Sequence, residues 1–363
     1  MTITDGPIVD PDDLAHIQHM IDQHSDVLFT WDYERSRPAL VKLYEKAKTS
    51  QWNASTDLDW STDVDLDKLA ADSQTTNARF NLLQTDPDSP LRSWGDKEWN
   101  QFAVEMQNFL LSQFLHGEQG ALICTGLITA TTPWIDAKYY AATQVMDEAR
   151  HVEVFARYID EKLGGPYPIN ANLGSLLDKI VEDNRWDVTY LGMQIMVEGL
   201  ALAAFGFMHM LTTEPLLKQL LRYVMSDEAR HVAFGVLSLK EYYEDLNATE
   251  IRERQEFAYE AAVQLKRRFS SGEVFERMGA DSKKVVEWVE SKGDPGQQMF
   301  QTMLFSKIVP NCRKLGILDA GAKEGEKGWL RTKFEELDII QFEHNIDTTE
   351  EYGTLDAIAA DRA

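Results

Sequence analysis

Cysteine is nearly absent from this chain of 363 residues, which contains only Cys124 and Cys312. Two cysteines supply neither a disulfide framework nor the thiolates of an iron–sulfur cluster or a Cys-rich metal site. Basic residues are also few, with 36 Lys and Arg against 60 Asp and Glu, so the formal net charge is −24. So acidic a chain argues against binding to nucleic-acid phosphates and to an anionic membrane surface, and we expect neither partner.

The sequence pattern also predicts neither a signal peptide nor a membrane-spanning helix. The first residues, MTITDGPIVDPDDL, are acidic and lack the basic and apolar regions of a signal peptide. The longest mostly apolar stretch, residues 109–130, could span a membrane by its length. However, His116 and Glu118 lie at its centre, where a charge in lipid is costly. We therefore expect a buried helix in a cytoplasmic protein.

Strand-forming patterns are scarce too, and an apolar periodicity of 3.6 residues dominates. The pattern predicts an all-α protein built on a four-helix bundle with additional N- and C-terminal helices. We expect N-terminal helices and an irregular acidic segment in residues 1–96, the bundle in residues 97–245, and further helices and an acidic tail packed on the bundle in residues 246–363. Two short breaks, at 131–134 and 212–215, each offer a Thr cap and a Pro suited to the start of the next helix.

The hexapeptide DEARHV occurs at residues 147–152 and again, letter for letter, at residues 227–232. A glutamate stands 30 residues before the glutamate of each copy. Three residues therefore recur at an offset of 80: Glu118, Glu148 and His151 become Glu198, Glu228 and His231. This spacing predicts a helical hairpin that the chain uses twice.

The spacing within each hairpin brings the repeated residues to one level. About 13 residues lead from Glu118 to the break and about 14 lead back to Glu148, which at about 1.5 Å per residue is roughly 20 Å up and 20 Å down. His151 lies three residues after Glu148, on the same helix face. The second hairpin repeats this geometry. If the hairpins pack together, four carboxylates and two imidazoles converge inside the bundle.

Four buried carboxylates require a counter-charge, because unpaired charges in a protein interior are prohibitively costly. Two divalent metal ions carry +4, and oxygen ligands with one imidazole per ion suit iron or manganese. A duplicated surface salt bridge, such as Asp227 with Arg230, is the simpler alternative. Two E-x-x-H motifs with matched upstream glutamates favour metal much more strongly. The predicted metal ligands are Glu118, Glu148, His151, Glu198, Glu228 and His231.

These motifs resemble those of the ferritin-like di-iron carboxylate oxidoreductases: hydroxylase subunits of bacterial monooxygenases, acyl-carrier-protein desaturases and p-aminobenzoate N-oxygenases. The resemblance is specific over residues 110–235. It implies a ferritin-like bundle holding two Fe ions, or Fe with Mn, and O2 as co-substrate. It also implies a supporting shell, in which Asp147 orients His231, Asp227 orients His151, and Arg150 and Arg230 balance the two aspartates.

Several activities occur among proteins of this kind, and the sequence ranks them. Phe155 stands where radical-forming subunits of ribonucleotide reductase usually carry a tyrosine, and Val224 stands where the N-oxygenases carry an extra histidine. The resemblance implies hydroxylation or oxygenation of a small organic substrate first, with Glu118 and Glu198 as catalytic residues. Desaturation of an acyl chain ranks second, and iron storage or an oxidative-stress role third.

The resemblance also implies partners. The sequence contains no nicotinamide or flavin fingerprint, so electrons would come from an external donor such as a ferredoxin or a reductase. A homodimer is the expectation from similar proteins.

Four residues next to the predicted ligands are candidates for a substrate pocket. Ala121 and Ala201 are small and would leave space beside Glu118 and Glu198, although small residues also serve close helix packing. Phe114 and Gln194 precede the two glutamates by four residues and should line the same faces. We predict that these four side chains line the pocket, although plain core is the better explanation for Phe114, and Gln194 is the better pocket candidate of the two.

Overall fold

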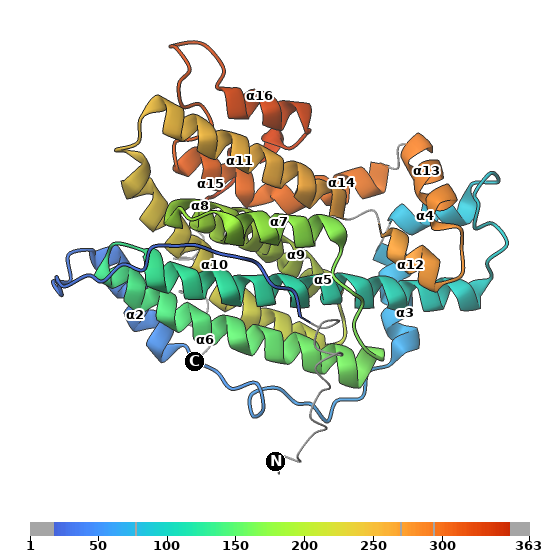
Figure 1. Cartoon of the computed structure of the whole chain (residues 1–363). Coiled ribbons are helices and arrows are strands. Elements are labelled where there is room, and N and C mark those ends of the chain that lie inside the picture. The colour runs from blue at the N-terminus through green and yellow to red at the C-terminus, as the bar shows by residue number, and fades with distance from the viewer. Residues whose placement is uncertain (1–17, 77, 269–270, 293–294, 349–363) are drawn as a thin grey trace.

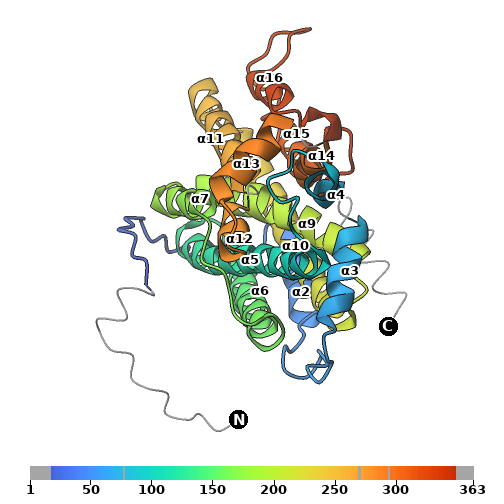
Figure 2. The same ribbon diagram turned by 90° about the vertical axis from the view of Figure 1, so that its right-hand side faces the viewer.

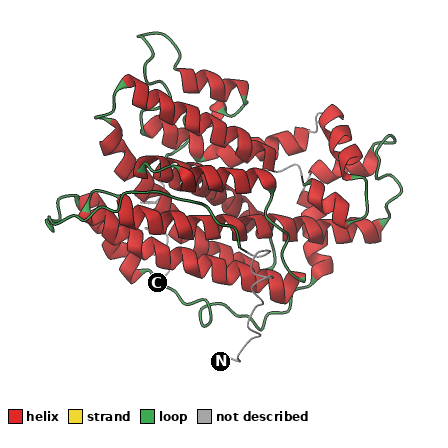
Figure 3. Ribbon diagram, in the orientation of Figure 1, coloured by secondary structure: helices red, strands yellow, loops and turns green. Residues whose placement is uncertain are grey.

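The computed structural model describes residues 18–76, 78–268, 271–292 and 295–348, and all regular structure among them is helical (Figure 1 and Figure 3). The predicted all-α fold is confirmed. Its centre is a bundle of four long helical segments. These are α5 (Asp96–Thr131), α6 (Ile135–Tyr158), a third segment made of α8 (Trp186–Tyr190), η2 (Leu191–Val197) and α9 (Glu198–Leu211), and α10 (Pro215–Tyr243).

The four segments form a closed ring of neighbours. α5 packs along α6, α6 contacts α10, α10 packs on α9 and η2, and α8 and η2 contact α5. Figure 2 looks along the bundle and shows α5, α6, α9 and α10 grouped at its centre. This ring is the ferritin-like arrangement in which side chains from all four helices can meet on the bundle axis.

The two turns lie at the predicted breaks, but threonine does not cap the helices that follow. α6 begins after Trp134, which makes no capping hydrogen bond with its side chain. α10 begins at Pro215, and its cap is Glu214, whose carboxylate accepts from the backbone N–H groups of Leu216 and Leu217 at 2.9 and 2.6 Å. The acidic cap also suits the positive end of the helix dipole.

The third segment is not a regular α-helix. Residues Leu191–Val197 form the π-helix η2, which inserts extra backbone before Glu198. The whole stretch, Trp186–Leu211, is long and apolar enough to cross a membrane, but 83% of its most apolar window is buried inside the fold. It therefore serves here as the core helix of the bundle.

A glycine makes room for η2 beside α10. A Cβ atom on Gly235 would lie 2.6 Å from the Cβ atom of Gln194, closer than two carbons can approach. The absence of a side chain at Gly235 thus lets the π-helix pack closely against α10, one turn beyond His231.

The N-terminal region covers one side of the bundle. α2 (Pro38–Thr49) packs on α6 and α10, and the irregular stretch that follows places Trp52 and Trp60 in the main core. α3 (Leu66–Thr76) contacts α5. The pattern of residues 12–24 predicts a further helix, but the part within the described residues, 18–24, is not helical.

Helices from the middle and the C-terminal part of the chain cover the opposite side. α11 (Ala248–Arg267) packs on η2 and α7 (Ala171–Glu182), and one cluster of buried side chains takes members from all three predicted regions. The remaining elements are α4 (Ala78–Thr85), η1 (Ile159–Leu163), α12 (Gly272–Arg277), α13 (Ser282–Lys292), α14 (Pro295–Met303), η4 (Leu304–Ser306), α15 (Ile308–Lys314), α16 (Trp329–Glu336) and η5 (Ile340–Phe342).

Candidate metal centre

The structure brings the six predicted ligands together on the bundle axis. Each of the four segments contributes: α5 gives Glu118, α6 gives Glu148 and His151, α9 gives Glu198, and α10 gives Glu228 and His231. All six are buried, with exposed fractions of 4% or less. Their ligand atoms form two groups that share Glu148, and within each group the atoms lie within 4.8 Å of one another.

The first group surrounds His151. Its Nδ1 atom lies 3.1 Å from an oxygen of Glu118, 3.3 Å from Glu148 and 3.0 Å from Glu228. One imidazole nitrogen thus faces carboxylates from three different helices. This arrangement is suited to surrounding one cation.

The second group surrounds His231. Its Nδ1 atom lies 3.0 Å from Glu148 and 3.7 Å from Glu228, and Glu198 completes the group with His231 and Glu148. Glu148 and Glu228 therefore lie between the two histidines, whereas Glu118 belongs to the His151 side and Glu198 to the His231 side.

The outer nitrogen of each histidine contacts an aspartate of the other DEARHV copy. His151 Nε2 lies 3.2 Å from Asp227, and His231 Nε2 lies 3.3 Å from Asp147. Because an ionised aspartate can only accept a hydrogen bond, each contact places the proton on Nε2 and leaves Nδ1 directed at the glutamates.

Two arginines neutralise these aspartates. Arg150 donates from Nη2 to Asp147 at 2.6 Å and to Asp227 at 2.9 Å. Arg230 donates to Asp227 and lies 3.7 Å from Asp147. The structure therefore places all four predicted supporting residues, two of each charge, in one buried network that crosses between α6 and α10.

The irregular segment after α2 completes this network. Trp52 donates its indole N–H to Asp227 at 2.7 Å, and Gln51 donates its amide to Asp147 at 2.9 Å while accepting from Arg150 at 2.8 Å. The Arg150 guanidinium also lies 4.6 Å from the centre of the Trp52 ring. The sequence interpretation missed both residues, because nothing in their local pattern shows that this loop folds over the DEARHV repeats.

A further residue that the interpretation missed is Gln144. Its amide nitrogen donates to Glu148 at 2.9 Å and to Glu198 at 3.0 Å, linking α6 to α9 inside the site. Gln144 precedes Glu148 by one helical turn, so helix spacing could have identified it. Val224 occupies the matching place in the second hairpin, so the site is less symmetric than its sequence motifs.

The pKa values of the glutamates in the site are shifted in different directions. Burial raises the pKa of Glu118, and the charge of Glu228 raises it further. Burial also raises the pKa of Glu198, with the charge of Glu148 adding to the effect. Burial acts in the same direction on Glu148, but the charges and hydrogen bonds of His231 and His151 together outweigh it and hold that pKa below its ordinary value.

Both histidines hold a proton tightly. Burial lowers the pKa of His151, but the hydrogen bond to Asp227 and the surrounding glutamates raise it well above its ordinary value. The pKa of His231 is raised in the same way, with Glu148 as the largest raising influence.

The formal charges show what the site requires. The four glutamates carry −4, the two aspartates −2 and the two arginines +2, which leaves −4 in a fully buried volume. Protons on Glu118, Glu198 and the two histidines offset this charge when no metal is bound. Two divalent cations would offset it with every ligand deprotonated.

Unsatisfied polar atoms support the binding of two divalent cations rather than four protons. Among the described residues, five buried atoms of this cluster form no hydrogen bond: Glu148 Oε2, Glu198 Oε2, Glu228 Oε1, Glu228 Oε2 and His231 Nδ1. Buried polar atoms rarely remain without partners, and a missing ion is one recognised reason. The donor set therefore fits two divalent cations, although the ligand roles of these residues stay a prediction.

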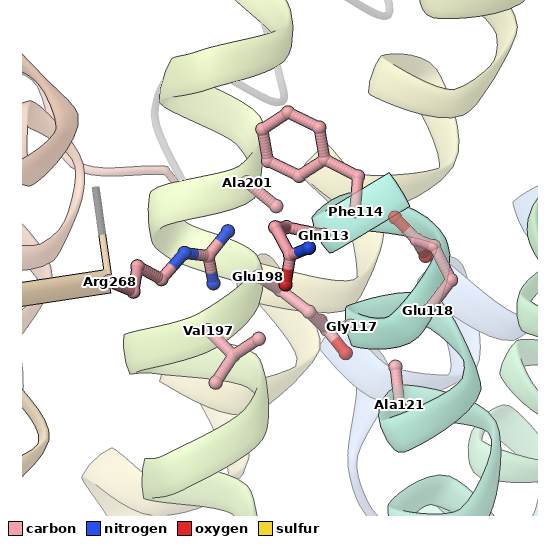
Figure 4. Close-up of a pocket in the computed structure, with 9 residues that line it drawn as sticks. All are labelled: Gln113, Phe114, Gly117, Glu118, Ala121, Val197, Glu198, Ala201 and Arg268. Atoms are coloured by element: carbon pink, nitrogen blue, oxygen red, sulfur yellow. The ribbon is translucent and has the colours of Figure 1, made fainter. Parts of the chain in front are cut away.

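A narrow pocket with a volume of about 10 Å³ lies beside the cluster (Figure 4). Glu118 and Glu198 both line it, so the pocket reaches the predicted centre. The other lining residues are Gln113, Phe114, Gly117 and Ala121 from α5, Val197 and Ala201 from the third segment, and Arg268 after α11. Three of the four predicted pocket residues, Phe114, Ala121 and Ala201, thus line the pocket.

Gln194 does not line this pocket, contrary to the expectation. The expectation assumed a regular α-helix, in which Gln194 lies one turn before Glu198. The π-helix turns Gln194 away, and its Cβ atom lies against Gly235 of α10. It is fully buried there, and its amide atoms form no hydrogen bond with the described residues.

Comparisons with known proteins give limited information. No family model and no curated protein matches the chain. Among solved structures, it is similar to an R2-like ligand-binding oxidase with aerobically reconstituted metal cofactor after photoconversion, with 16% identity over 78% of this chain and 94% of that chain and a TM-score of 0.49.

Two mutants of R2-like ligand-binding oxidase with reconstituted Mn/Fe cofactor are similar to the same degree. The identities are 16% and 17%, the TM-scores are 0.48 and 0.46, and the matches cover 80% and 75% of this chain and 98% and 94% of those chains. A likeness at this level carries no information on the activity or the bound metal of this chain.

Proposed function

We propose that the protein is an O2-dependent oxidoreductase with two Fe ions, or Fe with Mn, held by the six ligands described above. We further propose that it hydroxylates or oxygenates a small organic substrate in the pocket next to Glu118 and Glu198. The supporting observation is the convergence of four glutamates and two histidines, with five unsatisfied polar atoms, beside that pocket.

When bound, the metal pair would supply the redox chemistry toward O2 that protein side chains lack. The chain itself holds and orients the ligands. Asp227 accepts a hydrogen bond from the Nε2–H group of His151, and Asp147 accepts one from that of His231, so both Nδ1 atoms face inward. Gln144 holds Glu148 and Glu198 at a fixed separation. Complete burial excludes bulk water, which strengthens every charge interaction in the site.

The pocket favours a small substrate over the desaturase alternative. Its volume of about 10 Å³ is far below that of typical ligand pockets, so a substrate enters only if lining side chains move, and a small substrate requires the least movement. Phe114 lines the pocket and packs on Phe205 behind it with ring centres 4.7 Å apart, and a long acyl chain would have to displace this pair. Glu118 and Glu198 are the ligands that face the pocket, so a bound substrate would lie against their side of the centre.

We also propose that an external protein or reductant supplies electrons, because the sequence carries no nicotinamide or flavin fingerprint. The acidic net charge of −24 would steer a donor that presents a basic surface.

The test is O2 consumption after anaerobic loading with Fe(II). The loaded wild-type protein and the exposed-surface control Glu153→Gln should consume O2 much faster than the same Fe(II) free in solution. The double variant Glu148→Gln/Glu228→Gln should consume it no faster than free Fe(II). Equal rates for the wild type and the double variant would exclude an oxygen-activating centre at this place.

A further inference from the structure

A row of aromatic rings runs from the predicted metal centre toward the surface of the bundle. Successive ring centres in this row lie 5.0, 5.4 and 4.7 Å apart, so each ring is in contact with the next. From the inside outward, the members of this aromatic row are Phe234, Tyr190, Trp186 and Tyr242. They belong to α10 and α8, which are parts of the central bundle.

The inner end of the aromatic row adjoins the metal centre. Phe234 follows the predicted ligand His231 by three residues on α10, so the two lie one helical turn apart. Phe234 also packs on Tyr140 of α6, with ring centres 4.4 Å apart, and Tyr140 lies one turn before Gln144. Gln144 donates to two of the predicted ligands. The innermost ring is therefore connected to the site through both α10 and α6.

The outer end of the row is partly exposed, and two aromatic residues contact Trp186 there. Tyr242 is one, and Trp134 is the other, with its ring centre 5.3 Å from that of Trp186. The guanidinium of Arg37 lies 4.2 Å from the centre of the Trp134 ring. A positive charge over a ring opposes the removal of an electron from that ring. Trp134 is therefore the less suitable of the two as an outer end.

The charges around Tyr242 are of both signs. Burial raises the pKa of Tyr242, Asp187 raises it further, and Arg254 acts in the opposite direction. Asp187 and Arg254 are themselves paired through two hydrogen bonds of 2.8 and 3.0 Å. No single charge thus dominates at Tyr242, in contrast to Trp134.

The hydroxyl group of Tyr190 is not explained by packing alone. Tyr190 is fully buried, and phenylalanine would fill nearly the same space without burying a polar atom. Burial raises the pKa of Tyr190, and the neighbouring hydroxyl groups of Thr132 and Ser238 act to lower it. A tyrosine that loses an electron also releases its phenolic proton, so a neighbouring hydroxyl oxygen gives that proton a place to move. The surroundings of Tyr190 therefore suit a residue that is oxidised and reduced again.

We propose that the aromatic row carries electrons, one at a time, from a donor near Tyr242 to the metal centre. Tyrosine and tryptophan are the side chains that lose one electron most readily. Electron transfer slows steeply with distance, so several short steps between touching rings are faster than one long step. Phe234 is not oxidised, and it fills the space between Tyr190 and the turn of His231 with a ring that the electron crosses.

The electrons and protons of one passage balance. Tyr190 loses one electron to the centre, where O2 is the oxidant, and its phenolic proton moves toward the hydroxyl groups beside it. Trp186 returns an electron to Tyr190, and the proton moves back. Tyr242 replaces the electron of Trp186 and releases its own phenolic proton to water. A one-electron donor such as ascorbate then reduces the Tyr242 radical, which takes up one proton.

This inference rests on the proposed function for its oxidant, but its test locates oxidation on the protein and does not measure product. Fe(II)-loaded protein is mixed with O2 without substrate or donor, examined by EPR spectroscopy, and digested for mass spectrometry. We expect a tyrosyl radical signal and oxidised Tyr242, and ascorbate added before O2 should prevent both. Trp186→Phe keeps a ring in place and should lose most of the oxidation at Tyr242. Its matched control, Trp134→Phe, should oxidise Tyr242 as the wild type does.

Tyr190→Phe interrupts the same row one step further in and should also lose the oxidation at Tyr242, which covers the case in which Trp186→Phe does not fold. Unchanged oxidation of Tyr242 in these variants would overturn the inference. Oxidation at Trp52, which contacts Asp227, in place of Tyr242 would also overturn it. O2 consumption without any oxidised aromatic residue would overturn the electron path and leave the proposed function standing. Absence of O2 consumption would overturn both.

Discussion

At the scale of single residues, Asp227 joins four neighbours from three parts of the chain. It accepts from Trp52 and Arg150 at 2.7 and 2.9 Å, is paired with Arg230, and lies 3.2 Å from His151. Burial acts to raise its pKa, but the hydrogen bond with His151 and the charges of His151 and both arginines outweigh it and hold that pKa far below its ordinary value. Asp227 is therefore ionised at any working pH and holds the histidine ring in place.

Replacing this aspartate should weaken the metal site without touching a ligand. Asp227→Asn exchanges a pure acceptor for an amide, so His151 loses the group that fixes its ring, and metal affinity should fall by roughly 10- to 100-fold. Arg150 and Arg230 also lose a buried counter-charge, which should cost about 3–5 kcal/mol of unfolding free energy. Chelator competition and chemical denaturation measure the two effects. An exposed control, Asp160→Asn, should change neither, and an unchanged affinity in Asp227→Asn would contradict the positioning role.

Trp52 should show a smaller effect of the same kind. Trp52→Phe removes the indole donor to Asp227 but keeps an aromatic face for Arg150. Losing one hydrogen bond to a charged group should cost about 1.5–3 kcal/mol, measured by chemical denaturation. A loss as large as that of Asp227→Asn would mean that Trp52 matters mainly through core packing.

At the scale of elements, the π-helix η2 decides which residues face the pocket. The extra backbone position in η2 before Glu198 rotates Gln194 toward α10, where the missing side chain of Gly235 leaves room for it. This close approach depends on the missing side chain at Gly235.

The packing of η2 on α10 gives a stability prediction. Gly235→Ala would place a Cβ atom 2.6 Å from Gln194 and should destabilise the protein by about 1–3 kcal/mol through overpacking. Gly206→Ala on α9 is the matched control, because its nearest neighbour, the Met225 methyl group, lies 3.7 Å away. That change should raise stability by up to about 1 kcal/mol, since alanine favours helix more than glycine does. Denaturant unfolding measures the change in unfolding free energy for both variants. A stabilised Gly235→Ala would show that η2 does not pack as described.

The same elements show what the sequence could and could not predict. The two hairpins and the convergence of six side chains were predictable, because helix rise and periodicity act locally and the repeat supplies the spacing. The π-helix was not, since a single extra backbone position leaves no periodic signal. Trp52 and Arg268 reach the site from an irregular segment and from the end of a distant helix, and only the tertiary fold brings them there.

At the scale of the whole molecule, the interior charge of the site makes stability depend on pH. The pKa values of Glu118, Glu198, His151 and His231 are all raised in the folded, metal-free protein. Each such group binds its proton more tightly when folded. Its stabilising effect is present below the ordinary pKa, near 4.5 for glutamate and 6.5 for histidine, and is lost as the pH rises through the raised value.

The metal-free protein should therefore lose stability as the pH rises above about 6.5, the ordinary pKa of histidine. The metal-loaded protein should not, because the ions replace the protons. Denaturant unfolding between pH 6 and 9, roughly the range in which histidine titrates, should show a gap between the two forms that widens with pH. Glu118→Gln/Glu198→Gln should flatten the metal-free curve. Parallel curves for the two forms of the wild type would contradict the exchange of protons for metal.

The count of metal ions per chain tests the central claim most directly. Protein loaded anaerobically with Fe(II) and freed of excess metal should retain about two ions per chain, the number that the ferritin-like dimetal ligand set provides for. Glu153→Gln should retain the same number, and Glu148→Gln/Glu228→Gln, which removes both glutamates that lie between the histidines, should retain none. A wild-type chain without bound iron, or a double variant that keeps two ions, would contradict the metal centre and leave the DEARHV repeat as a buried salt-bridge network.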